Sequence, residues 1–260
     1  MIQNKLFFFL FVSLPLAGSA QSRFFTDSLF SSSLNEYRRI TIYLPDKYDE
    51  HSIVYPVIYT TDGQLITDFY RKSMDSLIEN KLTAPFILIG SHSNEQPVGG
   101  VEYRNLDYMR MKYNPESPLT IRFNEHMKFY SEELIQYAES NYRVSIKPQE
   151  RIFYGVSNGA DFGVSLAQDH PELVKCFILF SVFGGTEKPF KWKEKDGIYF
   201  YLGYGIREMQ HVEEEALRME EYFIKRGISH FLVTWTGGHD RKEWELAFFK
   251  ALVRLEEQLK

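Results

Sequence analysis

The chain has 260 residues, of which 44% are hydrophobic and 25% are charged, and its formal net charge at pH 7 is −5. A chain of this length fits one compact domain, and its negative charge argues against nucleic acid or an anionic membrane surface as a partner. The single cysteine, Cys176, excludes an internal disulfide.

The first twenty residues predict a secretory signal. Lys5 precedes an apolar stretch from Leu6 to Leu16, and the small residues Ala17 to Ala20 would form a cleavage site. A membrane anchor is the alternative interpretation, but an apolar core of about a dozen residues is shorter than the ~20 needed to span a bilayer. We therefore expect export to the periplasm or the extracellular space, with residues 21–260 as a single domain that has no membrane span.

Short apolar runs alternate with helical patterns along the rest of the chain. Strands are expected at about 38–44, 57–62, 86–91, 151–156, 176–181, 197–203 and 231–236, and helices near 68–80, 123–141, 158–168, 209–226 and 240–258. This alternation is typical of the α/β class, with a doubly wound and mainly parallel sheet.

The stretch from Ser93 to Pro118 predicts a long loop, because it is rich in Asn, Pro, Tyr, Arg and Met. Ligands of open α/β sheets bind at the carboxyl ends of the strands, where such a loop would lie. Its candidate substrate contacts are Arg104 and Tyr108, together with Asp107 and Arg110. Most loop residues are structural or solvated, so each of these is a candidate only.

A Gly-x-Ser-x-Gly pattern at Gly155, Ser157 and Gly159 joins the strand expected at 151–156 to the helix that follows it. This pattern is typical of a nucleophile elbow, in which the serine occupies a strained turn and the two glycines let the backbone approach closely. The alternative is a glycine-rich turn with an idle serine.

A serine hydroxyl is a poor nucleophile until a neighbouring base takes its proton. His239 follows the strand expected at 231–236, in the loop Gly237 to Asp240, and this position suits such a base. His92 also follows a strand at the same edge of the sheet. It precedes Ser157, however, whereas the order in α/β-hydrolases is serine, acid and then histidine.

The acid that orients the histidine should lie between Ser157 and His239 in the chain. Glu208 follows the strand expected at 197–203 and occupies this place. The alternative is an acidic residue that stabilises the first turn of the next helix. Asp240 ranks second, because a residue adjacent to His239 reaches the same ring only awkwardly.

Four further segments carry a resemblance to a known family. They are Tyr37–Pro45, which ends in Y-L-P, Tyr55–Gly63, which reads Y-P-V-x-Y-x-x-D-G, the helical stretch Phe123–Arg143, and the ending Gly237–Asp240 with Trp244. With the elbow, they resemble the esterase family of α/β-hydrolases that includes esterase D, feruloyl and acetyl-xylan esterases, and enterochelin esterases.

This resemblance implies the α/β-hydrolase fold, with Ser157 as nucleophile, His239 as base and Glu208 as acid. It also implies an oxyanion hole made of backbone N–H groups. Those groups would come from Gly63, Gln64 and Asn158.

The residues predict a serine hydrolase that cleaves a carboxylic ester through an acyl-enzyme, with no cofactor and no metal. The expected partner is a small-molecule ester, such as that of a siderophore or an acylated sugar. An acyltransferase on the same scaffold and a non-catalytic ligand-binding module remain alternatives. The identity of the ester and the oligomeric state stay open.

Overall fold

A computed structural model describes residues 21–94, 97–98, 101–110, 118–184 and 190–258. The signal segment expected at residues 1–20 lies outside the described residues. No helix in the described part of the chain is long and apolar enough to cross a membrane.

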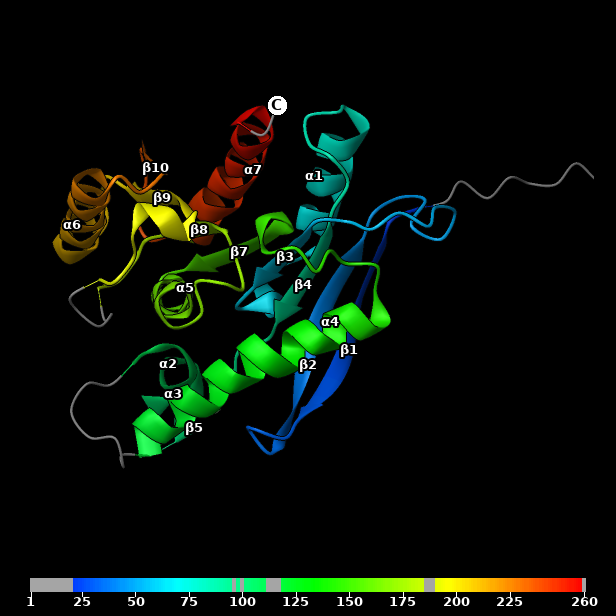
Figure 1. Ribbon diagram of the computed structural model, residues 1–260, viewed down its shortest axis with the longest axis horizontal. Coiled ribbons are helices and arrows are strands. Elements are labelled where there is room, and N and C mark those ends of the chain that lie inside the picture. Colours follow the sequence, from blue (N-terminus) through cyan, green and yellow to red (C-terminus); the bar gives the residue numbers. More distant parts are fainter. Residues whose placement is uncertain (1–20, 95–96, 99–100, 111–117, 185–189, 259–260) are drawn as a thin grey trace, which may run out of the picture.

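An eight-stranded sheet forms the centre of the molecule (Figure 1). Its strands, in chain order, are β1 (Arg23–Ser31), β2 (Glu36–Leu44), β3 (Val57–Thr60), β4 (Ile87–Ser91), β7 (Arg151–Val156), β8 (Cys176–Phe180), β9 (Tyr199–Gly205) and β10 (His230–Trp235). Their order in the sheet is β1-β2-β4-β3-β7-β8-β9-β10. The pairs from β4 to β10 are parallel, whereas β2 is antiparallel to both β1 and β4. The sheet is therefore mainly parallel, as predicted.

Helices cover both faces of the sheet. They are α1 (Asp68–Glu79), α2 (Tyr103–Tyr108), α3 (Pro118–Lys128), α4 (Ile135–Asn141), α5 (Asn158–Asp169), α6 (Gln210–Arg226) and α7 (Arg241–Gln258). A π-helical turn, Phe129–Leu134, joins α3 to α4. Figure 1 shows α1 and α7 on one face, with α4, α5 and α6 on the other.

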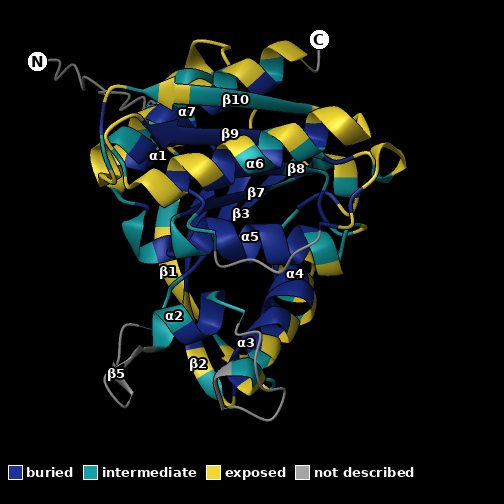
Figure 2. Ribbon diagram, turned by 90° about the vertical axis from the view of Figure 1, so that its left-hand side faces the viewer, coloured by how far each residue is buried: buried dark blue, intermediate teal, exposed yellow. Residues whose placement is uncertain are grey.

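Alternation along the strands builds a core on each face, because successive side chains of a strand point to opposite sides. In β7, Phe153 packs against Phe162 of α5, while its neighbour Tyr154 packs against Phe248 of α7. Figure 2 shows the central strands buried and the outer surfaces of the helices exposed.

Three regions differ from the prediction. The strand β1 was not expected, because it is an edge strand whose side chains are mostly exposed and lack a clear apolar pattern. The stretch 93–118, expected to be one loop, contains the short ribbon β5 (Pro97–Val98) and β6 (Val101–Glu102) and the helix α2. The helix expected to begin near residue 123 begins at Pro118.

Candidate active site

The backbone turns tightly between β7 and α5, at Ser157. Ser157 has φ 55° and ψ −129°, a conformation that is strained for a residue with a side chain. A Cβ atom on Gly155 would lie 2.4 Å from the carbonyl oxygen of Gly159, and one on Gly159 would lie 2.4 Å from Thr61 Oγ1. A side chain at either position would clash with these atoms, so both positions require glycine. The segment therefore has the geometry of a nucleophile elbow.

The turn brings Ser157 within hydrogen-bond distance of His239. Ser157 Oγ lies 3.0 Å from His239 Nε2, and His239 Nδ1 lies 2.8 Å from Glu208 Oε2. Since a carboxylate only accepts, Nδ1 carries the proton that is shared with Glu208, and the lone pair of Nε2 faces the serine. The ring is thus in the tautomer that can take a proton from Ser157.

Glu208 is almost fully buried, with its side chain 1% exposed. Its other oxygen, Oε1, accepts hydrogen bonds from Ser181 Oγ at 2.6 Å and from the backbone N–H of Gly205 at 2.9 Å. Burial favours the neutral acid, but the hydrogen bonds from His239, Ser181 and Gly205 outweigh it and lower the pKa of Glu208 below its usual value. Glu208 is therefore ionised at neutral pH.

Two residues that the sequence analysis did not single out for a role complete this chain of contacts. Trp244 Nε1 donates to Ser181 Oγ at 2.7 Å, and the indole lies edge-on to the His239 ring with 4.7 Å between centroids. Ser181 Oγ in turn donates its own hydrogen bond to Glu208 Oε1. Its position at the end of β8, next to the elbow strand, is the sequence signal that could have identified it.

The other candidate acid and base lie elsewhere. Asp240 Oδ1 accepts the backbone N–H of Lys242 at 2.8 Å, at the start of α7, while Glu208 is the carboxylate on His239. His92 Nε2 lies 2.7 Å from Thr41 Oγ1 rather than beside Ser157. The structure therefore brings together Ser157, His239 and Glu208, in the chain order expected.

The opposite wall of the site is the turn from Asp62 to Gln64, after β3. Asp62 adopts the left-handed conformation with φ 54°, and a Cβ atom on Gly63 would lie 2.1 Å from the carbonyl oxygen of Gly90. Thr41 Oγ1 donates to the Gly63 carbonyl at 3.0 Å. In a trans peptide the carbonyl and the next N–H point in opposite directions, so this bond orients the N–H of Gln64.

The helix α2 connects this turn to the elbow. Arg104 Nε and Nη2 donate to the two carboxylate oxygens of Asp62 at 2.7 and 2.8 Å. Asn158 Nδ2, at the start of α5, donates to Asn105 Oδ1 at 2.7 Å. Gly63, Gln64 and Asn158, the residues expected to form an oxyanion hole, thus lie on two segments that α2 holds together.

The expectation that Tyr108 contacts substrate is wrong. Tyr108 is 1% exposed, packs under Arg104, and accepts the backbone N–H of Asp62 through its hydroxyl at 3.2 Å. Its role is to support the Asp62 turn from below. Arg104 is 19% exposed and keeps an edge toward solvent.

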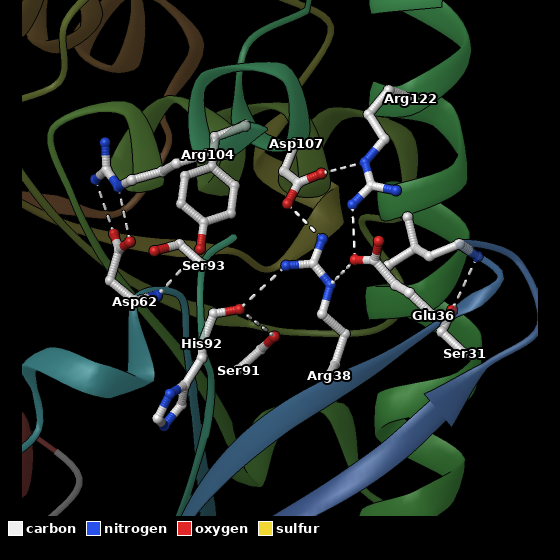
Figure 3. A network of polar contacts seen from close by, with 12 residues as sticks. Ser31, Glu36, Arg38, Asp62, Ser91, His92, Ser93, Arg104, Asp107 and Arg122 are labelled. Carbon is white, nitrogen blue, oxygen red and sulfur yellow. Dashed lines mark hydrogen bonds and ion pairs between the residues drawn. The ribbon is translucent and has the colours of Figure 1, made fainter. Parts of the chain in front are cut away.

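A buried ion-pair network anchors α2 to the sheet (Figure 3). Asp107 is fully buried and accepts from Arg122 Nε of α3 at 2.7 Å and from Arg38 Nη2 of β2. Glu36 Oε1 accepts from Arg122 Nη2 at 2.8 Å and forms an ion pair with Arg38 Nε at 2.8 Å, and Arg38 also donates to the carbonyl oxygen of His92. Buried charges are costly unless paired, and here two carboxylates balance two guanidinium groups.

In the part of the chain that is described, no three His, Cys, Asp or Glu side chains gather in a way that could hold a metal ion. The hydrogen bonds from Ser157 through His239 to Glu208 suit nucleophilic catalysis by the serine.

Comparison with known proteins places this geometry in context. The family model described as "Putative esterase" matches residues 31–202. The uncharacterized protein YjcH of Bacillus subtilis (strain 168) is 26% identical over 174 residues, which is 65% of this chain and 64% of that protein. The chain thus spans less than two thirds of that relative.

Solved structures share the fold. A ferulic acid esterase superposes with a TM-score of 0.75 at 18% identity, covering 91% of this chain and 99% of the other. The enterochelin esterase of Shigella flexneri superposes with a TM-score of 0.73 at 15% identity, covering 91% of this chain and 59% of the other. The prediction of an α/β-hydrolase fold is therefore confirmed.

Proposed function

The chain belongs to the "Putative esterase" family of α/β-hydrolases, and from this premise we propose that it is a serine esterase that hydrolyses a carboxylic ester through an acyl-enzyme. The observation that carries the proposal is the continuous pair of hydrogen bonds from Ser157 through His239 to Glu208, at 3.0 and 2.8 Å. The family, the fold and this geometry support one reaction class.

In the acylation step, Ser157 Oγ attacks the ester carbonyl carbon while its proton passes to His239 Nε2. The imidazolium that forms is stabilised by the ionised Glu208, which accepts from Nδ1. The backbone N–H groups of Gly63, Gln64 and Asn158 would stabilise the oxyanion. When the tetrahedral intermediate collapses, His239 returns the proton to the leaving alcohol and the acyl group stays on Ser157.

Deacylation repeats these steps with water. Water gives its proton to His239 and attacks the acyl carbon, and collapse of the second intermediate releases the acid and restores the hydroxyl of Ser157. An alcohol in place of this water would make the protein an acyltransferase. Product analysis with added alcohols distinguishes the two reactions.

The test uses a fluorophosphonate probe and an activated aryl ester. We expect the wild type to be labelled once, at Ser157, and to hydrolyse the ester, while Ser157→Ala does neither and stays folded. Circular dichroism provides the control for folding. An unlabelled wild type with no hydrolytic activity would favour the non-catalytic module, and an active Ser157→Ala variant would move the site elsewhere.

The substrate class is proposed to be an ester of a siderophore or of an acylated sugar. The fold is shared with a ferulic acid esterase and an enterochelin esterase, and this likeness supports the choice of substrates to try. A panel of feruloyl sugars, acetylated sugars and a catecholate trilactone, compared by kcat/KM, would identify the better class. Rates on all three below that on a plain aryl acetate would contradict it.

Export is proposed on the sequence of residues 1–20 alone. Lys5, the apolar stretch Leu6 to Leu16 and the small residues ending at Ala20 support cleavage before Gln21. Mass spectrometry of the protein recovered from its native host should find Gln21 at or near the N-terminus. An intact Met1 would contradict export.

A further inference from the structure

A groove of about 420 Å³ lies at the carboxyl end of β4, next to the turn expected to bind the oxyanion. Its lining comes from three segments, Glu36 to Arg39 of β2, Gln64 of the turn, and His92 to Asn94 after β4. In the sheet, β4 is the second strand from β7 and β2 the third. With neighbouring strands ~4.8 Å apart, the groove lies roughly 10–14 Å from the strand that carries Ser157.

One positive charge in the lining is not balanced. Arg38 is engaged with Glu36 and Asp107. Arg39 is exposed and forms no ion pair with any residue that the structure describes. The groove therefore presents a free guanidinium on a protein whose overall charge is −5.

His92 adds no second charge, but it connects the groove to the oxyanion turn. Burial, assisted by the nearby charge of Arg39, lowers the pKa of His92 to about 4, so the ring is neutral at pH 7. Thr41 Oγ1 donates its proton to the Gly63 carbonyl, so it accepts from His92 Nε2–H. The wall of the groove is thereby hydrogen-bonded to the peptide that precedes Gln64.

The side of the nucleophile on which the groove lies indicates which part of a substrate it meets. The leaving alcohol must face His239 to receive its proton, and His239 and Glu208 follow β10 and β9, beyond β7 and β8 from the groove. The acyl part then extends the other way, past Gln64.

We propose that this groove is a subsite for a carboxylate at the far end of the acyl part of the ester, and that Arg39 binds that carboxylate. The inference rests on the proposed esterase function and narrows its substrate class to acyl groups that carry a remote negative charge. A guanidinium matches a carboxylate in geometry as well as in charge.

The test uses 4-nitrophenyl monoesters of straight-chain dicarboxylic acids of increasing length, each paired with the substrate whose free carboxylate is methylated. We expect the wild type to prefer the free acid at the length that reaches the groove, and to lose this preference as salt is added. In Arg39→Gln the ratio of kcat/KM for the acid to that for its methyl ester should fall about tenfold, the effect of one charge-assisted hydrogen bond. Arg39→Lys should keep part of the ratio.

Arg226→Gln is the matched control, because Arg226 is exposed at the end of α6 and lies outside the groove lining. It should leave the ratio unchanged. A wild type without preference at any length, or an Arg39→Gln variant with the wild-type ratio, would overturn the subsite and leave the esterase proposal intact. A wild type inactive on both members of every pair would overturn both.

Discussion

The two walls of the site are built on different physical principles. On the acid–base wall, formed by β8, β9 and β10, a line of hydrogen bonds connects Trp244, Ser181, Glu208 and His239 to Ser157. On the oxyanion wall, formed by β2, β3, β4 and α2, backbone groups are expected to act on the substrate, and ion pairs with side-chain bonds hold them in place. Substitutions on the acid–base wall should therefore remove the groups that transfer the proton. Substitutions on the oxyanion wall should only misalign the backbone N–H groups that stabilise the oxyanion.

The largest effect is expected at the base. His239→Ala should lower kcat/KM for an activated ester about 10⁵-fold or more, because nothing else accepts the serine proton. The double variant with Ser157→Ala should be little worse than His239→Ala, since the two residues act as a unit. Single-turnover kinetics on folded protein would measure both, and additive losses would contradict a shared role.

The acid–base wall next predicts a strong difference between two neighbouring carboxylates. Glu208→Gln should lower kcat about 10³–10⁴-fold, because the amide stabilises neither the tautomer nor the imidazolium. Asp240→Asn is the control and should change kcat by less than about threefold, since the Asp240 carboxylate bonds only the start of α7 in the described structure. A large loss at Asp240 with none at Glu208 would reverse the assignment of the acid.

The contrast between the walls also explains what the sequence could reveal. The elbow at Ser157 and the loop at His239 are local patterns at strand ends, so both were predictable from a few consecutive residues. Chain position also favoured Glu208 over Asp240, but the hydrogen bond from Ser181 Oγ that holds the Glu208 carboxylate could not be predicted, because Ser181 lies 27 residues away in the chain.

The helix α2 could be predicted least of all. Arg104 bonds Asp62, which is 42 residues away, and Asp107 bonds Arg38, which is 69 residues away. Contacts of such separation leave no periodic pattern in the segment itself, so the stretch resembled a loop. For the same reason Tyr108 looked available to substrate, although it is buried under Arg104.

On the oxyanion wall, Arg104→Gln should reduce kcat about 30-fold while KM changes by less than about twofold, because the turn loses its alignment and not its substrate contacts. It should also destabilise the fold by about 3 kcal/mol, since Asp62 is left as a buried charge without its partner. Asp62→Asn combined with Arg104→Gln removes the unpaired charge. If this double variant regains the stability of the wild type but not its kcat, the loss of kcat comes from a misplaced turn and not from partial unfolding.

A smaller change on the same wall isolates orientation of the Gly63–Gln64 peptide. Thr41→Val keeps the shape of a residue that is 3% exposed and deletes only its hydroxyl. We expect kcat to fall about tenfold with KM unchanged, and Thr41→Ser to restore most of the rate. Thr234→Val, an exposed strand position in β10, is the matched control. Equal rates for Thr41→Val and wild type would mean that the turn keeps its alignment without this bond.

The smallest expected effect is on the free energy of unfolding and its dependence on pH, and it concerns Glu208 on the acid–base wall. The pKa of Glu208 in the folded state is lower than its ordinary value of 4.5 because its hydrogen bonds outweigh burial. Such a group stabilises the fold above pH 4.5, and this contribution is lost as the pH falls through its folded pKa.

Glu208→Gln should therefore cost about 1–2 kcal/mol of unfolding free energy at pH 7, and this cost should shrink as the pH is lowered from 5 toward 3. Urea unfolding of the two proteins across this range measures the difference. A cost that grows on acidification would show that burial, and not hydrogen bonding, dominates at Glu208.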